Sequence, residues 1–322
     1  MLATFWSTAA AAVVIAAVAL TIGWRARRRW VGRVLAVGLL LAAAWPAALA
    51  GYLGVRWAAG QPEARTLHLA NGVIYERLVA TEPRPYVAHV VRIDLQAGHR
   101  LVVTPPLDTP DGRRNFARVT TDALAALDAD VAINASFFRP FRDQWFLDYA
   151  PHSGDPVEPV GATVADGVRY GLELPAQADW PALCVDDAGA VRLGGVDDAT
   201  RWAVSGIGWL LRDGRPQGLS IDPEPYPRTA VGLDAAARTM WWVLVDGKQP
   251  RYSEGLTLDE LTSLLRELGA TDAINLDGGG SVTLATTRTG GGPVVLNRPA
   301  HTKIPGRQRP VASHLGLRVV EP

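Results

Sequence analysis

Two long apolar stretches at the N-terminus constrain the fold of this chain most strongly. No side chain from Leu2 to Trp24 carries a charge, and a second apolar stretch runs from Val34 to about Val55. Each is long enough to cross the hydrocarbon core of a bilayer as a helix. A cleaved signal peptide would carry its positive charges before the apolar core, whereas here they follow it. The sequence therefore predicts a transmembrane hairpin over residues 1–57.

The loop between the two predicted helices is rich in arginine and contains Arg25, Arg27, Arg28, Arg29 and Arg33. Cytoplasmic loops of membrane proteins carry an excess of Lys and Arg, so we expect this loop in the cytoplasm. Everything after Arg56 is then predicted to lie on the extracytoplasmic side of the cell (inner) membrane. The alternative, a buried helix pair in a soluble domain, is disfavoured because two uncharged stretches of this length rarely occur there side by side.

The composition of the chain argues against several classes of function. The 322 residues carry a formal net charge of zero, which argues against a nucleic acid as partner. Cys184 is the single cysteine, so no intramolecular disulfide can form and metal sites built from several cysteines are excluded. Gly60 and Pro62 mark residues 58–66 as a linker, and residues 67–322 are the predicted extracytoplasmic domain.

The domain is predicted to be rich in short strands. A helix with Thr120 or Thr121 as its cap is expected before residue 131, and the Pro-, Gly- and Asp-rich segment 139–198 indicates loops and hairpins. Runs of β-branched and aromatic residues bounded by turn signals predict the strands. These lie at 68–79, broken by Asn71-Gly72, and at 87–95, 100–104, 131–134, 203–211, 228–234 and 239–245.

A helix and a strand lead to the most distinctive motif. Thr257 and Glu260 have the spacing of a capping box, leucines follow at helical spacing, and Gly269 is a suitable stop. The apolar segment 273–276 then predicts a strand whose end carries Asp277. Strand ends are the usual location of sites in sheets of this kind.

Three glycines follow Asp277 directly, and two hydroxyl side chains come soon after them. Gly278, Gly279 and Gly280 leave the backbone free to take positive φ and to lie against a ligand. Consecutive N–H groups in such a turn can converge on an anion, with the carboxylate beside them. The simpler alternative is a tight turn in which Asp277 only caps a glycine, but turn chemistry usually needs one glycine.

Several segments, taken in order, resemble the phosphodiester glycosidase family. They cover roughly residues 87–320, and the triple-glycine block makes the match specific. The matching segments are Ile133 to Phe138, Arg228 to Gly232, Leu244 to Lys248, Tyr252 to Leu261, Leu264 to Ala270, Asn275 to Ser281, Asn297 to Pro299 and Arg309 to Val311. The chain departs from the family pattern at Ala135 and Ser136, usually glycines, and at Lys248, often an arginine.

The resemblance implies an α/β fold with a mixed sheet and cleavage of a sugar from a phosphodiester. The expected substrate is a glycan or glycolipid phosphodiester of the cell envelope. Phosphate is a good leaving group that needs little protonation, so the site must clamp phosphate and stabilise positive charge at the anomeric carbon. Arg228 and Arg309 suit the clamp through their planar forks, and Lys248 through its point charge. Asp277 is the first choice for the catalytic carboxylate, and Asp246 is the second member of a pair.

The matching segments supply the predicted substrate-binding set. Asn134 is expected to face ligand because small residues follow it, and Thr283 can share a face with Ser281 because the two alternate along a strand. Phe137 and Phe138 fit a core position better than a sugar platform. The full set is Asn134, Arg228, Thr229, Lys248, Gly278, Gly279, Gly280, Ser281, Thr283, Asn297 and Arg309.

The sequence also allows other roles for Asp246 and other functions for the domain. Asp246 and Gly247 would also suit a purely structural hairpin turn. The domain could bind anionic glycans or assist polysaccharide assembly without turnover. It could also be a glycosidase or phosphodiesterase assisted by a divalent ion between Asp277 and Asp246, although no metal-ligand motif supports one and no cofactor is required.

Overall fold

The computed structural model describes residues 10, 11, 13–21, 30–145, 148–219 and 223–321. The chain divides into two compact units, Met1–Gly60 and Gln61–Pro322. The smaller unit contains helix α2 (Trp30–Ala58), and residues 10, 11 and 13–21 are also helical.

Helix α2 meets the requirements of a membrane span. In the described part of the chain it is the one helix long and apolar enough to cross a bilayer, over Val34–Tyr52. Leu41 and Trp45 in this segment are 69% and 75% exposed, so its apolar side chains do not form a protein core. The first predicted span extends beyond the described residues, and Arg25 to Arg29 lie outside them. The structure thus supports one span and leaves the two-helix hairpin a prediction.

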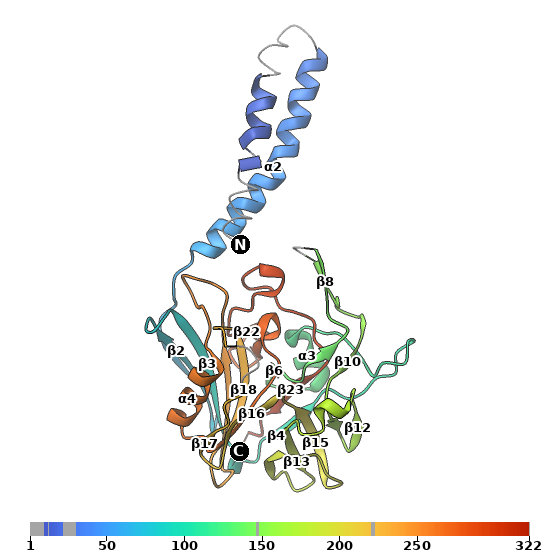
Figure 1. Ribbon diagram of the computed structural model, residues 1–322, viewed down its shortest axis with the longest axis vertical. Helices are drawn as coiled ribbons and strands as arrows, with labels where there is room; N and C mark the ends of the chain where they lie inside the picture. Colours follow the sequence, from blue (N-terminus) through green and yellow to red (C-terminus); the bar gives the residue numbers. More distant parts are fainter. Residues whose placement is uncertain (1–9, 12, 22–29, 146–147, 220–222, 322) are drawn as a thin grey trace. The chain divides into compact units, whose positions relative to one another are not determined.

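The larger unit is a sheet-rich domain with two α-helices, α3 (Thr120–Leu127) and α4 (Leu258–Leu268) (Figure 1). Its first strands are β1 (Arg65–Ala70), β2 (Val73–Ala80), β3 (Tyr86–Asp94), β4 (Arg100–Val103), β5 (Asn115–Phe116), β6 (Val131–Asn134), β7 (Phe138–Arg139), β8 (Arg142–Trp145), β9 (Asp148–Ala150), β10 (Pro156–Pro159), β11 (Thr163–Ala165) and β12 (Val168–Tyr170). The later strands are β13 (Ala182–Asp186), β14 (Val191–Gly194), β15 (Thr200–Ser205), β16 (Gly208–Arg212), β17 (Arg215–Pro216), β18 (Arg228–Leu233), β19 (Thr239–Val245), β20 (Asp272–Asn275), β21 (Leu284–Thr286), β22 (Val294–Val295) and β23 (His314–Arg318). Short 3₁₀ turns are η1 (Leu95–Ala97), η2 (Pro175–Gln177), η3 (Gly279–Ser281) and η4 (His301–Lys303).

Three sheets make up most of the domain. An eight-stranded sheet has the order β1-β2-β3-β19-β18-β20-β16-β17, and two five-stranded sheets have the orders β22-β21-β6-β23-β4 and β12-β11-β15-β13-β14. A mixed sheet was predicted, but every pair of the described strands is antiparallel. Parallel pairing is limited there to isolated bridges, Val160 with Leu172 and Ala300 with Arg307.

Both faces of the eight-stranded sheet are buried at its central strands, as strand β19 shows. Met240, Trp242 and Leu244 point into the main core, which the β6-containing sheet also lines. The alternate residues Trp241 and Val243 pack on the other face, which α4 covers. Side chains of a strand alternate between faces, so an almost continuous apolar run is what a doubly covered strand requires. Helix α3 packs against the β6-containing sheet through a separate cluster.

Most predicted elements are confirmed, with two corrections. Thr257 and Glu260 form the capping box of α4, and Gly269 ends the helix in the left-handed region, with φ of 104°. The residue at the N-cap of α3 is Val119, not Thr120 or Thr121. The single strand predicted at 203–211 is two strands, β15 and β16, which belong to different sheets.

Candidate active site

Asp277 lies just beyond the end of β20, where the eight-stranded sheet meets the β6-containing sheet. Its backbone N–H donates to the Ala135 carbonyl at 3.0 Å, and the Asn134 amide donates to the Asp277 carbonyl at 2.6 Å. The preceding Leu276 N–H donates to the Thr229 carbonyl at 2.8 Å. Contacts from both sheets therefore fix the backbone that carries the carboxylate.

Each of the three glycines has its own steric reason. A Cβ on Gly278 would lie 2.7 Å from the Pro227 carbonyl oxygen, and one on Gly280 would lie 2.6 Å from a terminal nitrogen of Arg309. Gly279 has a φ of 65°, which disfavours any other residue. The glycines thus allow a close approach of neighbouring chain and of Arg309. The Gly279 N–H donates to the Pro227 carbonyl at 2.8 Å and the Ser281 N–H to the Gly278 carbonyl at 3.3 Å, so these two N–H groups do not take part in the predicted anion-binding turn.

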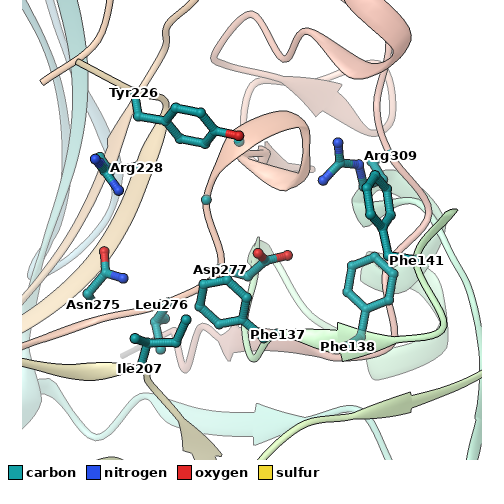
Figure 2. A pocket seen from close by; sticks show the side chains of 12 residues that line it. Phe137, Phe138, Phe141, Ile207, Tyr226, Arg228, Asn275, Leu276, Asp277 and Arg309 are labelled. Carbon is teal, nitrogen blue, oxygen red and sulfur yellow. The ribbon is translucent and has the colours of Figure 1, made fainter. Parts of the chain in front are cut away.

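Asp277 faces a cavity of about 410 Å³. Figure 2 shows the carboxylate near the centre, with Arg309 and Arg228 on opposite sides, Tyr226 across from Phe137, and Phe138 beside Phe141. The lining consists of Phe137, Phe138, Phe141, Ile207, Tyr226, Arg228, Asn275, Leu276, Asp277, Gly278, Gly279 and Arg309. Such a combination of aromatic walls with few polar groups is typical of a small-molecule site.

The carboxyl of Asp277 is electrostatically unusual. Burial raises its pKa to about 6, although the charge of Arg309, the Ser281 hydroxyl and the Gly278 N–H each oppose that rise. Its Oδ2 atom is buried and has no hydrogen-bond partner among the described residues. A buried polar atom without a partner is costly and is found where a ligand completes the site.

Arg309 is held in place from three sides. Its Nε donates to Nδ1 of His301 and one terminal nitrogen donates to the Ser281 hydroxyl, each at 3.2 Å. The guanidinium carbon lies 4.5 Å from the centre of the Phe141 ring. Burial, with the charges of Arg309 and Arg307, lowers the pKa of His301 to about 3, so the neutral imidazole can accept this hydrogen bond. The guanidinium is thus oriented beside Asp277 before any ligand arrives.

Arg228 and Asn275 contribute polar groups on the other side of the cavity. Arg228 donates through Nε to the Leu256 carbonyl at 3.3 Å, and its guanidinium carbon lies 5.2 Å from the centre of the Tyr226 ring. Asn275 is buried, and its Oδ1 has no partner among the described residues. The cavity therefore offers an unpaired acceptor as well as cationic groups.

Asp246 does not line this cavity and belongs to a buried polar network. Its carboxylate accepts hydrogen bonds from His89 at 2.9 Å, Tyr252 at 2.8 Å and the Asn297 amide at 2.8 Å, and from the Arg298 N–H at 2.9 Å. Burial alone would raise the pKa of Asp246, but these partners together lower it. The expected pair of catalytic carboxylates is therefore not formed. Asp246 has a structural role through this network, and not through the hairpin turn considered for it, because β19 is followed by α4 and pairs only with the earlier strands β3 and β18 among the described strands.

We expect Asp246→Ala to destabilise the domain strongly. The change would leave His89, Tyr252 and Asn297 buried without their shared acceptor, and each buried polar group left without a partner costs about 1–3 kcal/mol. Chemical denaturation of the full chain in detergent measures this. Asp187→Ala is the control, because Asp187 is exposed and meets only Arg201 at 3.4 Å. Equal stability of the two variants would contradict the structural role.

The remaining predicted residues fall into two groups. Arg228, Gly278, Gly279 and Arg309 line the cavity with Asp277, and Gly280 and Ser281 contact Arg309. The others lie outside the cavity lining. Asn134, Thr229, Thr283 and Asn297 are buried in the scaffold, and Lys248 is exposed with its Nζ 3.8 Å from the centre of the Tyr226 ring.

Sequence reasoning missed several lining residues. Tyr226, Asn275 and Ile207 were not predicted in the site, nor was the support that His301 gives to Arg309. The sequence did contain a signal for a site role of Asn275, because Asn275 is the polar residue that ends the apolar strand next to Asp277. Phe137 and Phe138 were expected in the core. Phe138 is buried but also lines the cavity, and Phe137 is half-buried and lines the cavity as well.

The family of this sequence follows from a direct comparison. The model of the phosphodiester glycosidase family matches residues 128–318. The chain belongs to the phosphodiester glycosidase family. The resemblance predicted from its motifs is confirmed, and the domain is a glycosidase-type hydrolase of glycosyl phosphodiesters. No curated protein sequence matches the chain significantly.

Solved structures share the fold of this phosphodiester glycosidase. The catalytic domain of zebrafish N-acetylglucosamine-1-phosphodiester alpha-N-acetylglucosaminidase, auto-inhibited by its pro-peptide, is 18% identical with a TM-score of 0.55, over 81% of this chain and 85% of that one. A hypothetical protein from Synechocystis is 15% identical with a TM-score of 0.53, over 80% and 64%. A putative exported protein from Burkholderia pseudomallei is 17% identical with a TM-score of 0.50, over 75% and 76%.

Proposed function

We propose that this phosphodiester glycosidase hydrolyses the bond between the sugar and phosphate of a glycosyl-1-phosphodiester in an envelope polysaccharide or glycolipid. The observation that carries the proposal is the buried carboxylate of Asp277, whose Oδ2 has no partner among the described residues, in a cavity that also presents Arg309 and Arg228. One anionic group beside cationic groups suits a substrate whose reacting carbon becomes positive while its leaving group is negative.

The proposed reaction needs little proton donation from the protein to the leaving group. The leaving phosphate monoester is stable as an anion, so the cavity can work without a second carboxyl group as general acid. Arg309 would bind the phosphate oxygens and stabilise the charge that they gain, and Arg228 would support it from the other side. Asp277 would act at the anomeric carbon, where the transition state resembles an oxocarbenium ion.

The rest of the cavity would hold the sugar. Phe137, Phe138 and Phe141 provide apolar ring faces against which the C–H groups of a pyranose can pack. The unpartnered Oδ1 of Asn275 would accept a hydrogen bond from a sugar hydroxyl or amide N–H. A substrate lacking that donor would leave the acceptor buried and unpaired, so Asn275 would contribute to sugar selectivity.

Hydrolysis of synthetic diesters in ¹⁸O-labelled water tests the proposed reaction. The panel consists of methyl phosphodiesters of N-acetylglucosamine, glucose, galactose and mannose in both anomeric forms, with products followed by ³¹P NMR. We expect release of unlabelled methyl phosphate and incorporation of ¹⁸O into the sugar, because the C–O bond is cleaved. Label in the phosphate, or release of sugar-1-phosphate, would show a phosphodiesterase instead.

The activity should depend on pH through Asp277. The carboxyl must be ionised to act at a cationic centre, and its pKa is raised to about 6 by burial. We therefore expect kcat/KM to be constant above about pH 7 and to fall about tenfold for each pH unit below 6. A pH profile on the best diester measures this limb. A rate that stays constant down to pH 4 would contradict an essential Asp277 carboxylate.

We propose that the domain lies on the extracytoplasmic side of the inner membrane. The support is the apolar segment of α2 and the arginine-rich loop before it. Alkaline phosphatase fused after Pro322 should be active in cells, since it folds only outside the cytoplasm, whereas a fusion placed at Arg28 should be inactive. Activity only at Arg28 would reverse the proposed orientation.

A further inference from the structure

A second cavity, of about 390 Å³, adjoins the active-site cavity. The Phe137 ring of the active site meets the Trp180 ring of the second cavity edge to face, with ring centres 6.3 Å apart. Ile207 lines the first cavity and Ser205, two residues earlier, lines the second. The two cavities therefore share a wall.

The floor of the second cavity is kept open by a glycine. Gly161 has a φ of 87°, and a Cβ at this position would lie 2.6 Å from Cβ of Ser205 and 3.4 Å from a ring carbon of Trp180. The Val160 N–H donates to the Phe137 carbonyl at 2.6 Å, which ties this floor to the active site. The half-buried Trp180 ring supplies one wall.

The polar groups of the second cavity are paired so that their charges cancel. Arg169 donates to both carboxylate oxygens of Glu173, through Nε at 2.8 Å and through a terminal nitrogen at 2.6 Å. Because these bonds lower the pKa of Glu173, the carboxylate stays ionised and balances the guanidinium. Gln177 adds a neutral amide to the lining. A guanidinium paired with a carboxylate in this way has no net charge to attract an anion, unlike the arginines around Asp277.

We propose that the second cavity is a subsite for a neutral sugar residue, the glycosyl unit next to the one that is cleaved. A half-buried indole beside donors and acceptors of balanced charge fits a hydroxyl-rich ring with apolar C–H faces. An acyl chain would lie against the charged groups of Arg169 and Glu173 without forming hydrogen bonds to them, and a phosphate would find no excess positive charge. The inference rests on the proposed function and extends it: the enzyme acts on phosphodiesters of oligosaccharides.

Binding of free sugars tests the subsite without any turnover. The full chain in detergent is titrated calorimetrically with maltotriose, chitotriose, mannotriose and galactotriose, and separately with inorganic phosphate. We expect at least one trisaccharide to bind, and Trp180→Ala and Arg169→Ala each to weaken it about tenfold. Arg169→Ala should fold normally, because an exposed ion pair contributes little stability. Trp209→Ala and Arg212→Ala are matched controls, since this stacked pair lies outside both cavities.

The outcomes separate the subsite from the proposed reaction. If no trisaccharide binds, or if Trp180→Ala binds as well as the parent protein, the subsite is overturned whatever the enzyme hydrolyses. Loss of binding in Trp180→Ala with no diester hydrolysis would overturn the reaction and keep the subsite. When diesters are hydrolysed, the ratio of kcat/KM for the disaccharide diester over the monosaccharide diester should fall about tenfold in Trp180→Ala. An unchanged ratio would contradict the proposal.

Discussion

Asp277→Asn is expected to lower hydrolysis of a glycosyl phosphodiester by roughly 10³-fold or more, with the protein still folded. Asparagine keeps the size of the side chain and removes the negative charge needed at the anomeric carbon. Stability should be equal or higher at neutral pH. Burial has raised the pKa of the Asp277 carboxyl to about 6, so its ionised form costs folding free energy above that pH, and asparagine removes this cost. Single-turnover rates and melting temperatures measure both effects.

Gly279→Ala gives a useful comparison with the asparagine variant. The added methyl group would sit on a residue with φ of 65° and 3.1 Å from the Tyr226 ring, so it should lower stability, affinity and rate together. Asp277→Asn should instead keep affinity for the diester. If Asp277→Asn retained its activity, the carboxylate would be a turn cap only, since asparagine caps turns equally well.

Local sequence signals predicted the elements that position the site. The capping box of α4, the strands β18 and β19, and the apolar strand before Asp277 each depend on residues close together in the chain. Such patterns report directly on local geometry. The triple-glycine block also located the centre of the cavity, and two of its glycines allow close packing of Pro227 and Arg309.

Long-range contacts explain what sequence reasoning could not supply. Asp246 was expected in the site because it lies in a segment that resembles the family, but its partner His89 is 157 residues away. Nothing in the local pattern shows that His89, Tyr252 and Asn297 converge on that carboxylate. Tyr226 enters the cavity in the same way, through folding of a proline-rich segment against η3. Residues whose role is set by distant neighbours need the structure.

Replacement of Arg309 should separate phosphate recognition from support of the fold. Arg309→Ala is expected to slow diester hydrolysis by on the order of 10²-fold or more, as for loss of a charge-stabilising donor in a site shielded from water. Hydrolysis of a neutral p-nitrophenyl glycoside should change far less. Arg309→Lys should recover little, because an ammonium cannot keep both the bond to His301 and the bond to Ser281 while meeting two phosphate oxygens. Initial rates on both substrates measure the difference.

The control for this replacement is Lys303→Ala, which removes an exposed cation of the same loop that does not line the cavity. It should leave both rates nearly unchanged. Equal losses on the two substrates in Arg309→Ala would show that Arg309 supports the sugar pocket, through the Phe141 ring that it stacks on, and does not bind phosphate. A selective loss on the diester would instead assign the leaving group to the side of the cavity where Gly280 makes room for the guanidinium. The sugar would then face the aromatic walls, with its reacting carbon next to Asp277.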